Sequence, residues 1–395
     1  MFKILYFLVV TFFFLIIFSF SHIFYIFWSD YVLSFFGRGG YGWIKSSIIV
    51  IYWFLFWLWL LIYLLKYKVY KKWNDVLKYV WIIIFWMIIS TILSINISGS
   101  VIWLSEKYEW LLYYLSFILF FLSVYFWIEK KEYKKITNYI FIFSIWVYIY
   151  WFIQFLWLDP LSSLYSTRVD ITRASSFFWN ANYLAWYILI LLPLSKIIEN
   201  NILKNIFIWI SFLALLSTWS YFGIFLWLIY LLYLVYFINK NLFIWLLVIS
   251  SVSIAYIFSW LSIEKYWSLL ARPYIWESSI LAIIDTPKTI LFWYWPDTLQ
   301  LVFNHFKVAE LSIYETANYT ADRTHNIFLD LIYFFWIFWW GIIIYFIINS
   351  INLKKGNNIK LSIIFFLLFF SFNVPVSIHF ILILFLMSWY YNKNL

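Results

Sequence analysis

The sequence contains no cysteine, and it has few glycines, prolines and charged residues. Without cysteine, a disulfide framework and a thiolate metal site are excluded. Only 11% of the residues are charged and 66% are hydrophobic, a balance that excludes an ordinary soluble domain. The four histidines (His22, His305, His325 and His379) are scattered and form no metal-binding motif. A nucleotide-binding glycine loop is also absent, so we expect no metal, no cofactor and no nucleic-acid partner.

The shortage of glycine is accompanied by an excess of tryptophan, since the chain has 8 Gly and 29 Trp. An average protein of this length carries about 28 glycines, at roughly 7%, and membrane helices usually hold more. Several tryptophans stand where glycine is typical, as in residues 293–296 (WYWP) and 339–341 (WWG). We therefore hypothesise that the organism decodes UGA as glycine, and that the written sequence gives tryptophan at those codons.

An aromatic belt is the alternative explanation of the tryptophan excess, because tryptophan anchors helices at the membrane interface. A belt predicts tryptophan near helix ends, whereas Trp53, Trp57 and Trp59 run through the middle of an apolar stretch. The nucleotide sequence decides between the two explanations. UGG codons at Trp179, Trp186 and at both tryptophans of the 293–296 segment would contradict recoding.

Apolar stretches of about 18 residues recur along the chain, each long enough to cross a bilayer core of about 30 Å. They predict an all-α polytopic membrane protein with about 12 transmembrane helices. The spans are expected near residues 4–27, 46–65, 78–97, 108–128, 137–158, 175–195, 204–218, 220–238, 242–260, 326–349, 359–373 and 376–391. The seventh and eighth spans are separated only by the polar break from Ser217 to Ser220.

The basic residues predict the orientation of these spans. Most of the 27 Lys and Arg fall on one side, which the positive-inside rule assigns to the cytoplasm together with both termini. Every arginine falls on the other side, in the outer segments: Arg38, Arg168, Arg173, Arg272 and Arg323. Because the planar guanidinium binds phosphate in a bidentate manner, this distribution favours an outer anion-binding site. Pairing with nearby acidic residues is the plainer alternative.

The longest outer loop runs over 261–325 and is the one segment with a soluble-like composition. A loop of this length usually carries function or short helices of its own. Within it, residues 272–284 are expected to form an amphipathic helix at the membrane surface. We divide the chain into N-terminal transmembrane helices (1–150), a core that includes the outer loop (151–350) and C-terminal transmembrane helices (351–395).

With glycine at the suspect tryptophans, the central part of the chain resembles a known family. Residues 154–160 become QFLGLDP and residues 173–194 become RASSFFGNANYLAGYILILLPL. Residues 271–303 acquire a GYGP turn after ARPYIWESSI, with Trp276 kept as tryptophan, and residues 322–341 read DRTHNIFLDLIYFFGIFGGG. These segments resemble, in order, the motifs of the bacterial O-antigen ligase and polymerase superfamily. The segment LLSTWSYFGIFLWL, which starts at Leu215, departs from it by Tyr221 in place of the usual arginine.

The resemblance implies a glycosyltransferase-C-like fold and a metal-independent transfer of a glycan from an undecaprenyl-diphosphate-linked donor. The acceptor is a hydroxyl of a lipid, of a growing glycan or of a protein, at the outer face of the cytoplasmic (inner) membrane. Arg173 and Arg272 match the motif arginines and are assigned to the diphosphate. His325 matches the motif histidine and is assigned as general base, or as the group that orients the acceptor hydroxyl. Arg323 and Arg168 are secondary candidates for binding the diphosphate or an anionic sugar.

Three alternatives remain open for these residues and for the function. Asn180 and Asn182 either cap the sixth span or touch the glycan. His325 is at the start of the tenth span, where Thr324 or Asn326 would cap the helix. The chain could instead transport a lipid-linked glycan, although transporters usually carry inverted repeats and interrupted helices, neither of which is visible in the sequence.

Overall fold

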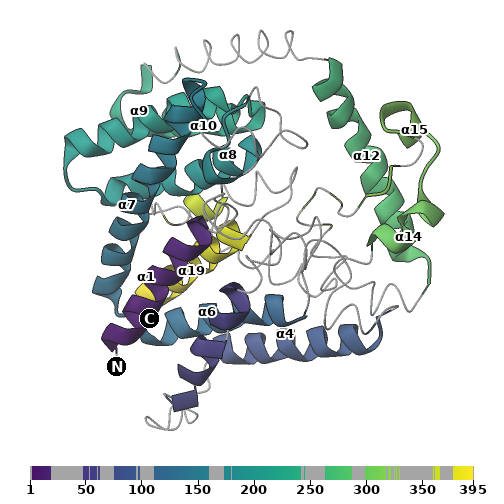
Figure 1. Ribbon diagram of the computed structural model, residues 1–395, viewed down its shortest axis with the longest axis horizontal. Helices are drawn as coiled ribbons and strands as arrows, with labels where there is room; N and C mark the ends of the chain where they lie inside the picture. Colours follow the sequence, from purple (N-terminus) through teal and green to yellow (C-terminus); the bar gives the residue numbers. More distant parts are fainter. Residues whose placement is uncertain are drawn as a thin grey trace.

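The computed structural model describes a helical protein in which the long apolar segments pack against one another (Figure 1). The described residues are 2–18, 48–52, 54–59, 61–62, 75–94, 97, 111–159, 173–178, 180–241, 244, 263–286, 299–316, 319–321, 324, 326, 329, 359, 361–364 and 377–394. No strand occurs within these residues. The predicted all-α class is therefore confirmed for this part of the chain.

The helices fall into a large bundle and a smaller group. The bundle contains α1 (Phe2–Phe18), α4 (Asp75–Ile92), α6 (Leu111–Trp127), α7 (Lys130–Phe155), α8 (Ala181–Leu191), α9 (Asn201–Ser217), α10 (Tyr221–Ile238) and α19 (Ser377–Asn394). Short 3-10 turns, Ser176–Phe178 and Leu192–Ile197, flank α8. The smaller group contains α12 (Ile263–Ile284), α14 (Leu299–Phe306) and α15 (Leu311–Tyr314), and it lies on the right in Figure 1.

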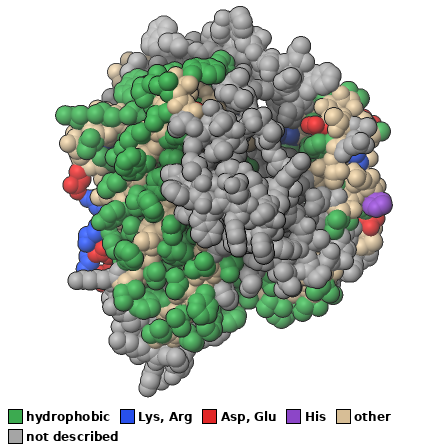
Figure 2. Space-filling view, in the orientation of Figure 1, with side chains coloured by type: hydrophobic (Ala, Val, Ile, Leu, Met, Phe, Trp, Pro, Cys, Tyr) green, Lys and Arg blue, Asp and Glu red, His purple; other side chains and the backbone are tan. Residues whose placement is uncertain are grey.

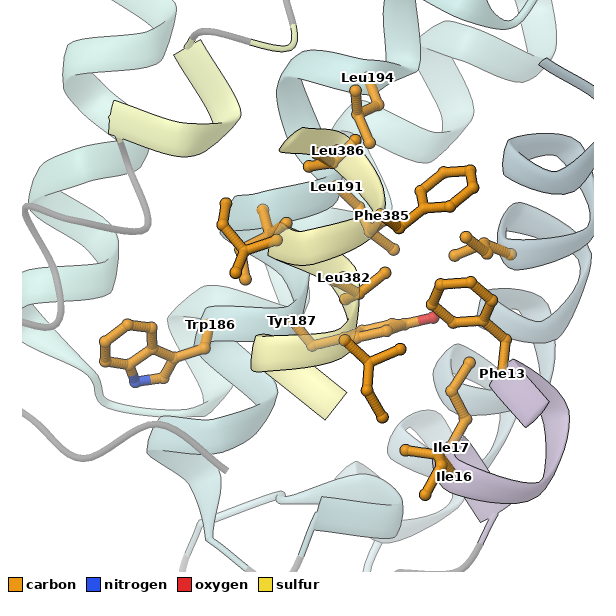
Figure 3. Packing of buried hydrophobic residues seen from close by; sticks show 14 of the residues in the cluster. Phe13, Ile16, Ile17, Trp186, Tyr187, Leu191, Leu194, Leu382, Phe385 and Leu386 are labelled. Atoms are coloured by element: carbon orange, nitrogen blue, oxygen red, sulfur yellow. The ribbon is translucent and has the colours of Figure 1, made fainter. Parts of the chain in front are cut away.

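One hydrophobic core holds the bundle together, and it joins segments that are far apart in the sequence. Figure 3 shows Leu382 and Phe385 of α19 packed between Tyr187 of α8 and Phe13 of α1. All four side chains are nearly or fully excluded from solvent. The C-terminal helix therefore completes the bundle that the N-terminal helix begins.

Helix α7 is also joined to its neighbours by side-chain hydrogen bonds inside this core. The Ser144 hydroxyl bonds the Tyr187 hydroxyl of α8 at 2.8 Å, and the Tyr148 hydroxyl bonds Ser211 of α9 at 2.7 Å. Near the end of α7, the indole nitrogen of Trp151 donates to the Ser217 hydroxyl. Such bonds satisfy polar groups that burial would otherwise penalise.

A second hydrophobic cluster lies entirely within the predicted outer segment 261–325. Ala271, Ile275 and Ala282 of α12 pack against Phe303 of α14 and Leu311 of α15. The expected helix over 272–284 is present as part of α12, which begins nine residues earlier, at Ile263. The outer segment thus has its own small core.

Most of the predicted spans coincide in part with a described helix, and the break between the seventh and eighth spans is confirmed. Helix α9 ends at Ser217 and α10 begins at Tyr221. Within the described residues one helix, Lys131–Phe155, is both long and apolar enough to cross a membrane. Shorter apolar helices are Ile4–Phe18, Ile48–Trp59, Val80–Ile92, Tyr113–Phe126, Ala181–Ile197, Asn201–Ser217 and Phe222–Tyr236. The twelve crossings stay a prediction, and the spans near 242–260 and 326–349 lie largely outside the described residues.

Candidate functional site

Arg173 lies between the end of α9 and the start of α8. Its Nε donates to the backbone carbonyl of Thr218 at 2.7 Å, and its Nη2 donates to Oδ1 of Asn182 at 3.0 Å. Thr218 is the C-cap residue of α9, where unpaired carbonyls and the negative end of the helix dipole favour a cation. These two hydrogen bonds hold the guanidinium in a fixed orientation.

The segment that carries Arg173 is fixed to the end of α7 by Gln154. Oε1 of Gln154 accepts the backbone N–H groups of Ser175 and Ser176 at 3.1 and 2.7 Å. Its Nε2 donates to Asp159 Oδ2 at 3.1 Å, and the Tyr150 hydroxyl donates to Asp159 Oδ1 at 2.9 Å. Gln154 therefore connects the α7 terminus to the backbone beside Arg173.

Asn180 caps helix α8. Its side chain accepts the backbone N–H of Asn182 at 2.8 Å, and its own backbone is extended, as is usual for an N-cap residue. The capping interpretation is confirmed for Asn180. Asn182 has a different role, because its side-chain oxygen accepts a hydrogen bond from Nη2 of Arg173. A contact of either residue with a glycan stays a prediction.

Left-handed backbone is concentrated at the same end of the bundle. Within the described residues, the non-glycine positions with positive φ are Trp157 (60°), Ser176 (51°) and Trp219 (49°). Trp157 follows α7, Ser176 donates its backbone N–H to Gln154, and Trp219 follows Thr218, whose carbonyl accepts from Arg173. Trp157 and Trp219 both lie just after a helix C-cap, a position where left-handed backbone commonly ends a helix.

Arg272 lies apart from Arg173, on α12, where Ala271 and Ile275 beside it enter the second hydrophobic cluster. Burial lowers the pKa of the Arg272 guanidinium, and the neighbouring Tyr319 opposes this change. Burial, with a contribution from Glu315, raises the pKa of Tyr319 to about 12, so its phenol is protonated at neutral pH. Tyr319 is thus a neighbour of Arg272 that no sequence motif indicated.

The chain between α14 and Tyr319 is held against α12 by polar contacts. Lys307 Nζ donates to the carbonyls of Tyr319 at 3.1 Å and Thr316 at 3.4 Å. The Val308 N–H donates to the Ser278 hydroxyl of α12 at 3.1 Å. Lys307 therefore supports the turn that brings Tyr319 to Arg272.

Three of the predicted site residues, His325, Arg323 and Arg168, lie outside the described residues. Around His325, the buried Thr324 accepts the N–H of Asn326 at 3.2 Å, and Oδ1 of Asn326 accepts the N–H of Leu329 at 3.3 Å. A side-chain oxygen that accepts the backbone N–H three residues later, as Asn326 does from Leu329, is typical of a helix N-cap. This agrees with the expected start of a helix at this point.

His379 lies in the core of the bundle rather than at the site. It is fully buried, its Nε2 is 3.2 Å from the Tyr183 carbonyl, and its ring packs near those of Tyr183 and Trp186. Within the described residues, no group of three His, Cys, Asp or Glu side chains is arranged to hold a metal ion.

The residues brought together by the structure are thus Arg173, Asn180 and Asn182 at the ends of α7, α8 and α9, whereas Arg272 belongs to the smaller helical group. Comparisons of the chain with protein-family models, with curated proteins and with solved structures find no match.

Proposed function

We propose that this chain is a multi-pass membrane enzyme that transfers a glycan from an undecaprenyl-diphosphate carrier to an acceptor hydroxyl. The reaction takes place at the outer face of the cytoplasmic membrane, and both termini of the chain are cytoplasmic. The acceptor oxygen forms a bond to the first sugar carbon as the bond from that carbon to the diphosphate breaks. The hydroxyl proton passes to a base, and the diphosphate leaves with the negative charge.

Exposed apolar side chains support the membrane location. One side of α7 presents Ile142, Ile145, Trp146, Ile149 and Phe152 to the surroundings. Figure 2 shows hydrophobic side chains over much of the bundle surface and charged side chains at its edge. A large contiguous apolar surface is costly in water and favourable against lipid.

The grouping of the chain segments supports the proposed orientation. Lys134 at the start of α7 bonds Glu199 in the segment before α9, and both belong to segments with a predicted cytoplasmic location. The ring of Tyr133 stacks on that of Trp389 near the C-terminus at 5.7 Å, and Tyr139 meets Tyr6 near the N-terminus at 6.2 Å. Segments expected on the cytoplasmic side therefore meet at one end of the bundle.

The observation that carries the proposal is the geometry of Arg173. Its guanidinium is oriented by Thr218 and Asn182 at the opposite end of the bundle, within the segment that resembles the family's outer arginine motif. A fixed guanidinium is suited to stabilise the diphosphate as negative charge develops on it. By the resemblance, Arg272 shares this role, Arg323 and Arg168 assist, and His325 accepts the proton.

Transfer to another glycan repeat (a polymerase) or to a protein hydroxyl (a protein O-oligosaccharyltransferase) uses the same donor chemistry. The described residues contain no feature that selects among lipid, glycan and protein acceptors. A transporter of the lipid-linked glycan is the more remote alternative. It differs from an enzyme in a measurable way, because a transporter leaves the bond between sugar and diphosphate intact.

Transfer from a defined undecaprenyl-diphosphate glycan by the purified full chain tests the proposal, with lipid, glycan and protein acceptors compared in parallel. We expect product release with one acceptor class, and a loss of about 10²–10³-fold in Arg272→Ala and His325→Ala. Lys131→Ala is the matched control, because this exposed cation at the cytoplasmic end pairs only with the nearby Glu129 among the ion pairs described.

Full transfer by His325→Ala would remove the histidine from the mechanism. Intact donor with every acceptor, under conditions where the chain is folded, would contradict the enzyme proposal.

A further inference from the structure

Two helices in the bundle, α7 and α9, are each followed by a C-cap residue and then by a tryptophan with left-handed backbone. Trp157 follows α7 with φ 60°, and Trp219 follows α9 with φ 49°. The left-handed region brings Cβ too close to the backbone in L-residues, and glycine adopts it without this penalty. Bulky residues at positive φ are uncommon in folded proteins.

The hydrogen bonds at the end of α7 form the Schellman pattern. The N–H of Trp157 donates to the Gln154 carbonyl at 3.0 Å, and the N–H of Leu158 donates to the Ile153 carbonyl at 3.1 Å. With Leu156 as the C-cap, Trp157 occupies the C′ position, where glycine is by far the usual residue. The indole is 74% exposed, so little burial offsets the backbone penalty.

The end of α9 has the first of these two bonds, whereas the N–H of Ser220 donates to the Thr218 hydroxyl at 3.3 Å. Thr218 is the C-cap, Trp219 is at C′, and the N–H of Trp219 donates to the Leu216 carbonyl at 3.1 Å. Trp219 is 57% exposed. Two of the three left-handed non-glycine residues described are thus tryptophans, and both stand at the one helix position that most favours glycine.

Trp151, in the same region, differs from these two tryptophans because it is helical and its side chain is buried and hydrogen-bonded. Trp151 lies inside α7, is buried, and donates its indole N–H to the Ser217 hydroxyl. Glycine at this position would remove that bond and the packed ring, and it would weaken the helix. The structure therefore separates tryptophans that use their side chain from those whose backbone is suited to glycine.

From this geometry we infer that positions 157 and 219 are glycine in the protein that the organism makes, and that tryptophan is retained at position 151. The codons at 157 and 219 are then UGA decoded as glycine, and the codon at 151 is UGG. Glycine at 157 agrees with the QFLGLDP motif of the resemblance, whereas glycine at 219 is assigned from the backbone alone. The inference does not rest on the proposed function.

Peptide mass spectrometry of the protein isolated from its own cells, together with the nucleotide sequence, tests the inference. We expect glycine masses and UGA codons at 157 and 219, and a tryptophan mass with UGG at 151. Tryptophan at either 157 or 219 would overturn the inference. Because this measurement needs no activity, its outcome is independent of the transfer assay.

Thermal unfolding of the full chain produced with tryptophan at all 29 positions gives a second measurement. We expect Trp157→Gly and Trp219→Gly each to raise the Tm by about 2–4 °C, and the matched control Trp151→Gly to lower it. A fall of Tm in both of the first two variants would count against glycine at these helix ends.

Discussion

The two ends of α7 hold their charged and polar groups in different ways. At its start, Lys131 pairs with Glu129 at 2.8 Å and Lys135 with Glu132 at 2.9 Å, and these side chains are well exposed except that of Glu132. At its end, Gln154 binds backbone N–H groups beside Arg173, whose own described partners are a carbonyl and an amide. One end has exposed ion pairs, and the other has half-buried directed hydrogen bonds.

This difference indicates that side-chain geometry is more fixed at the C-terminal end of α7 than at its start. Exposed ion pairs contribute little to stability and adapt easily, because water and salt screen them. Hydrogen bonds from a partly buried guanidinium to backbone and amide groups are stronger and hold a direction.

The largest expected effect is at Arg173. Arg173→Ala leaves the Thr218 carbonyl and the Asn182 side chain without this donor, so we expect the free energy of unfolding to fall by about 1–3 kcal/mol. Transfer is expected to fall by about 10²–10³-fold. Denaturant unfolding in detergent and the transfer assay measure the two effects.

Arg173→Lys keeps the charge and loses the planar fork, so we expect it to fold better than Arg173→Ala but to remain impaired in transfer. Lys131→Ala is the comparison at the other end, with unchanged transfer. Equal loss of transfer in the two alanine variants would remove the distinction between the ends of α7.

Gln154 gives the next effect. Gln154→Leu has a similar size but cannot accept the Ser175 and Ser176 N–H groups, so we expect a loss of about 1–3 kcal/mol in the free energy of unfolding. Hydrogen exchange at the amides of Ser175 and Ser176 checks the cause, because both should exchange faster. Unchanged protection would show that Gln154 does not fix this segment.

Asn180 and Asn200 are both helix N-caps, one near Arg173 and the other near the exposed ion pairs at the start of α7. Asn180 caps α8 beside Arg173, and Asn200 caps α9 beside Glu199. Each change to alanine is expected to cost about 1 kcal/mol of stability. Lower transfer in Asn180→Ala alone would assign it a glycan contact, and equal transfer in both variants would leave capping as its whole role.

The smallest effect is the pH dependence of the Lys134–Glu199 pair. The bond from Lys134 holds the pKa of Glu199 below its ordinary value of 4.5. The pair therefore stabilises the fold above that value, and its contribution is lost as the pH falls through the lowered pKa. Thermal unfolding from pH 7 into acid should show this small loss in the natural chain and not in Glu199→Gln.

Apolar periodicity and the polar break at 217–220 were sufficient to predict most of the described helices and the turn between α9 and α10. The first and last residues of the helices were harder to predict from the sequence. Helix α7 begins at Lys130 rather than near 137, because its charged first turns continue the helix beyond the apolar stretch. The predicted single span over 175–195 is divided into two 3-10 turns and α8, with Pro193 at the second turn.

Within the site, sequence motifs identified Arg173, Asn180 and Asn182, but not the groups that hold them. Gln154 and Thr218 act through an amide oxygen and a backbone carbonyl, and such roles depend on how distant segments meet. Tyr319 likewise becomes relevant only when the chain after α14 turns back to α12. Periodicity records which side of a helix is buried, but it does not record these long-range contacts.

The hydrogen bonds from Ser144, Tyr148 and Trp151 also determine the register of α7 along its neighbouring helices. Apolar contacts alone tolerate sliding of one helix along another, because a shifted leucine meets another apolar surface. Each of these polar groups bonds one side chain of a neighbouring helix, so a displacement of α7 by a single turn would break all three bonds together. The register of α7 against α8 and α9 is thereby fixed in the interior, and the same register determines the level at which Gln154 meets the segment that carries Arg173.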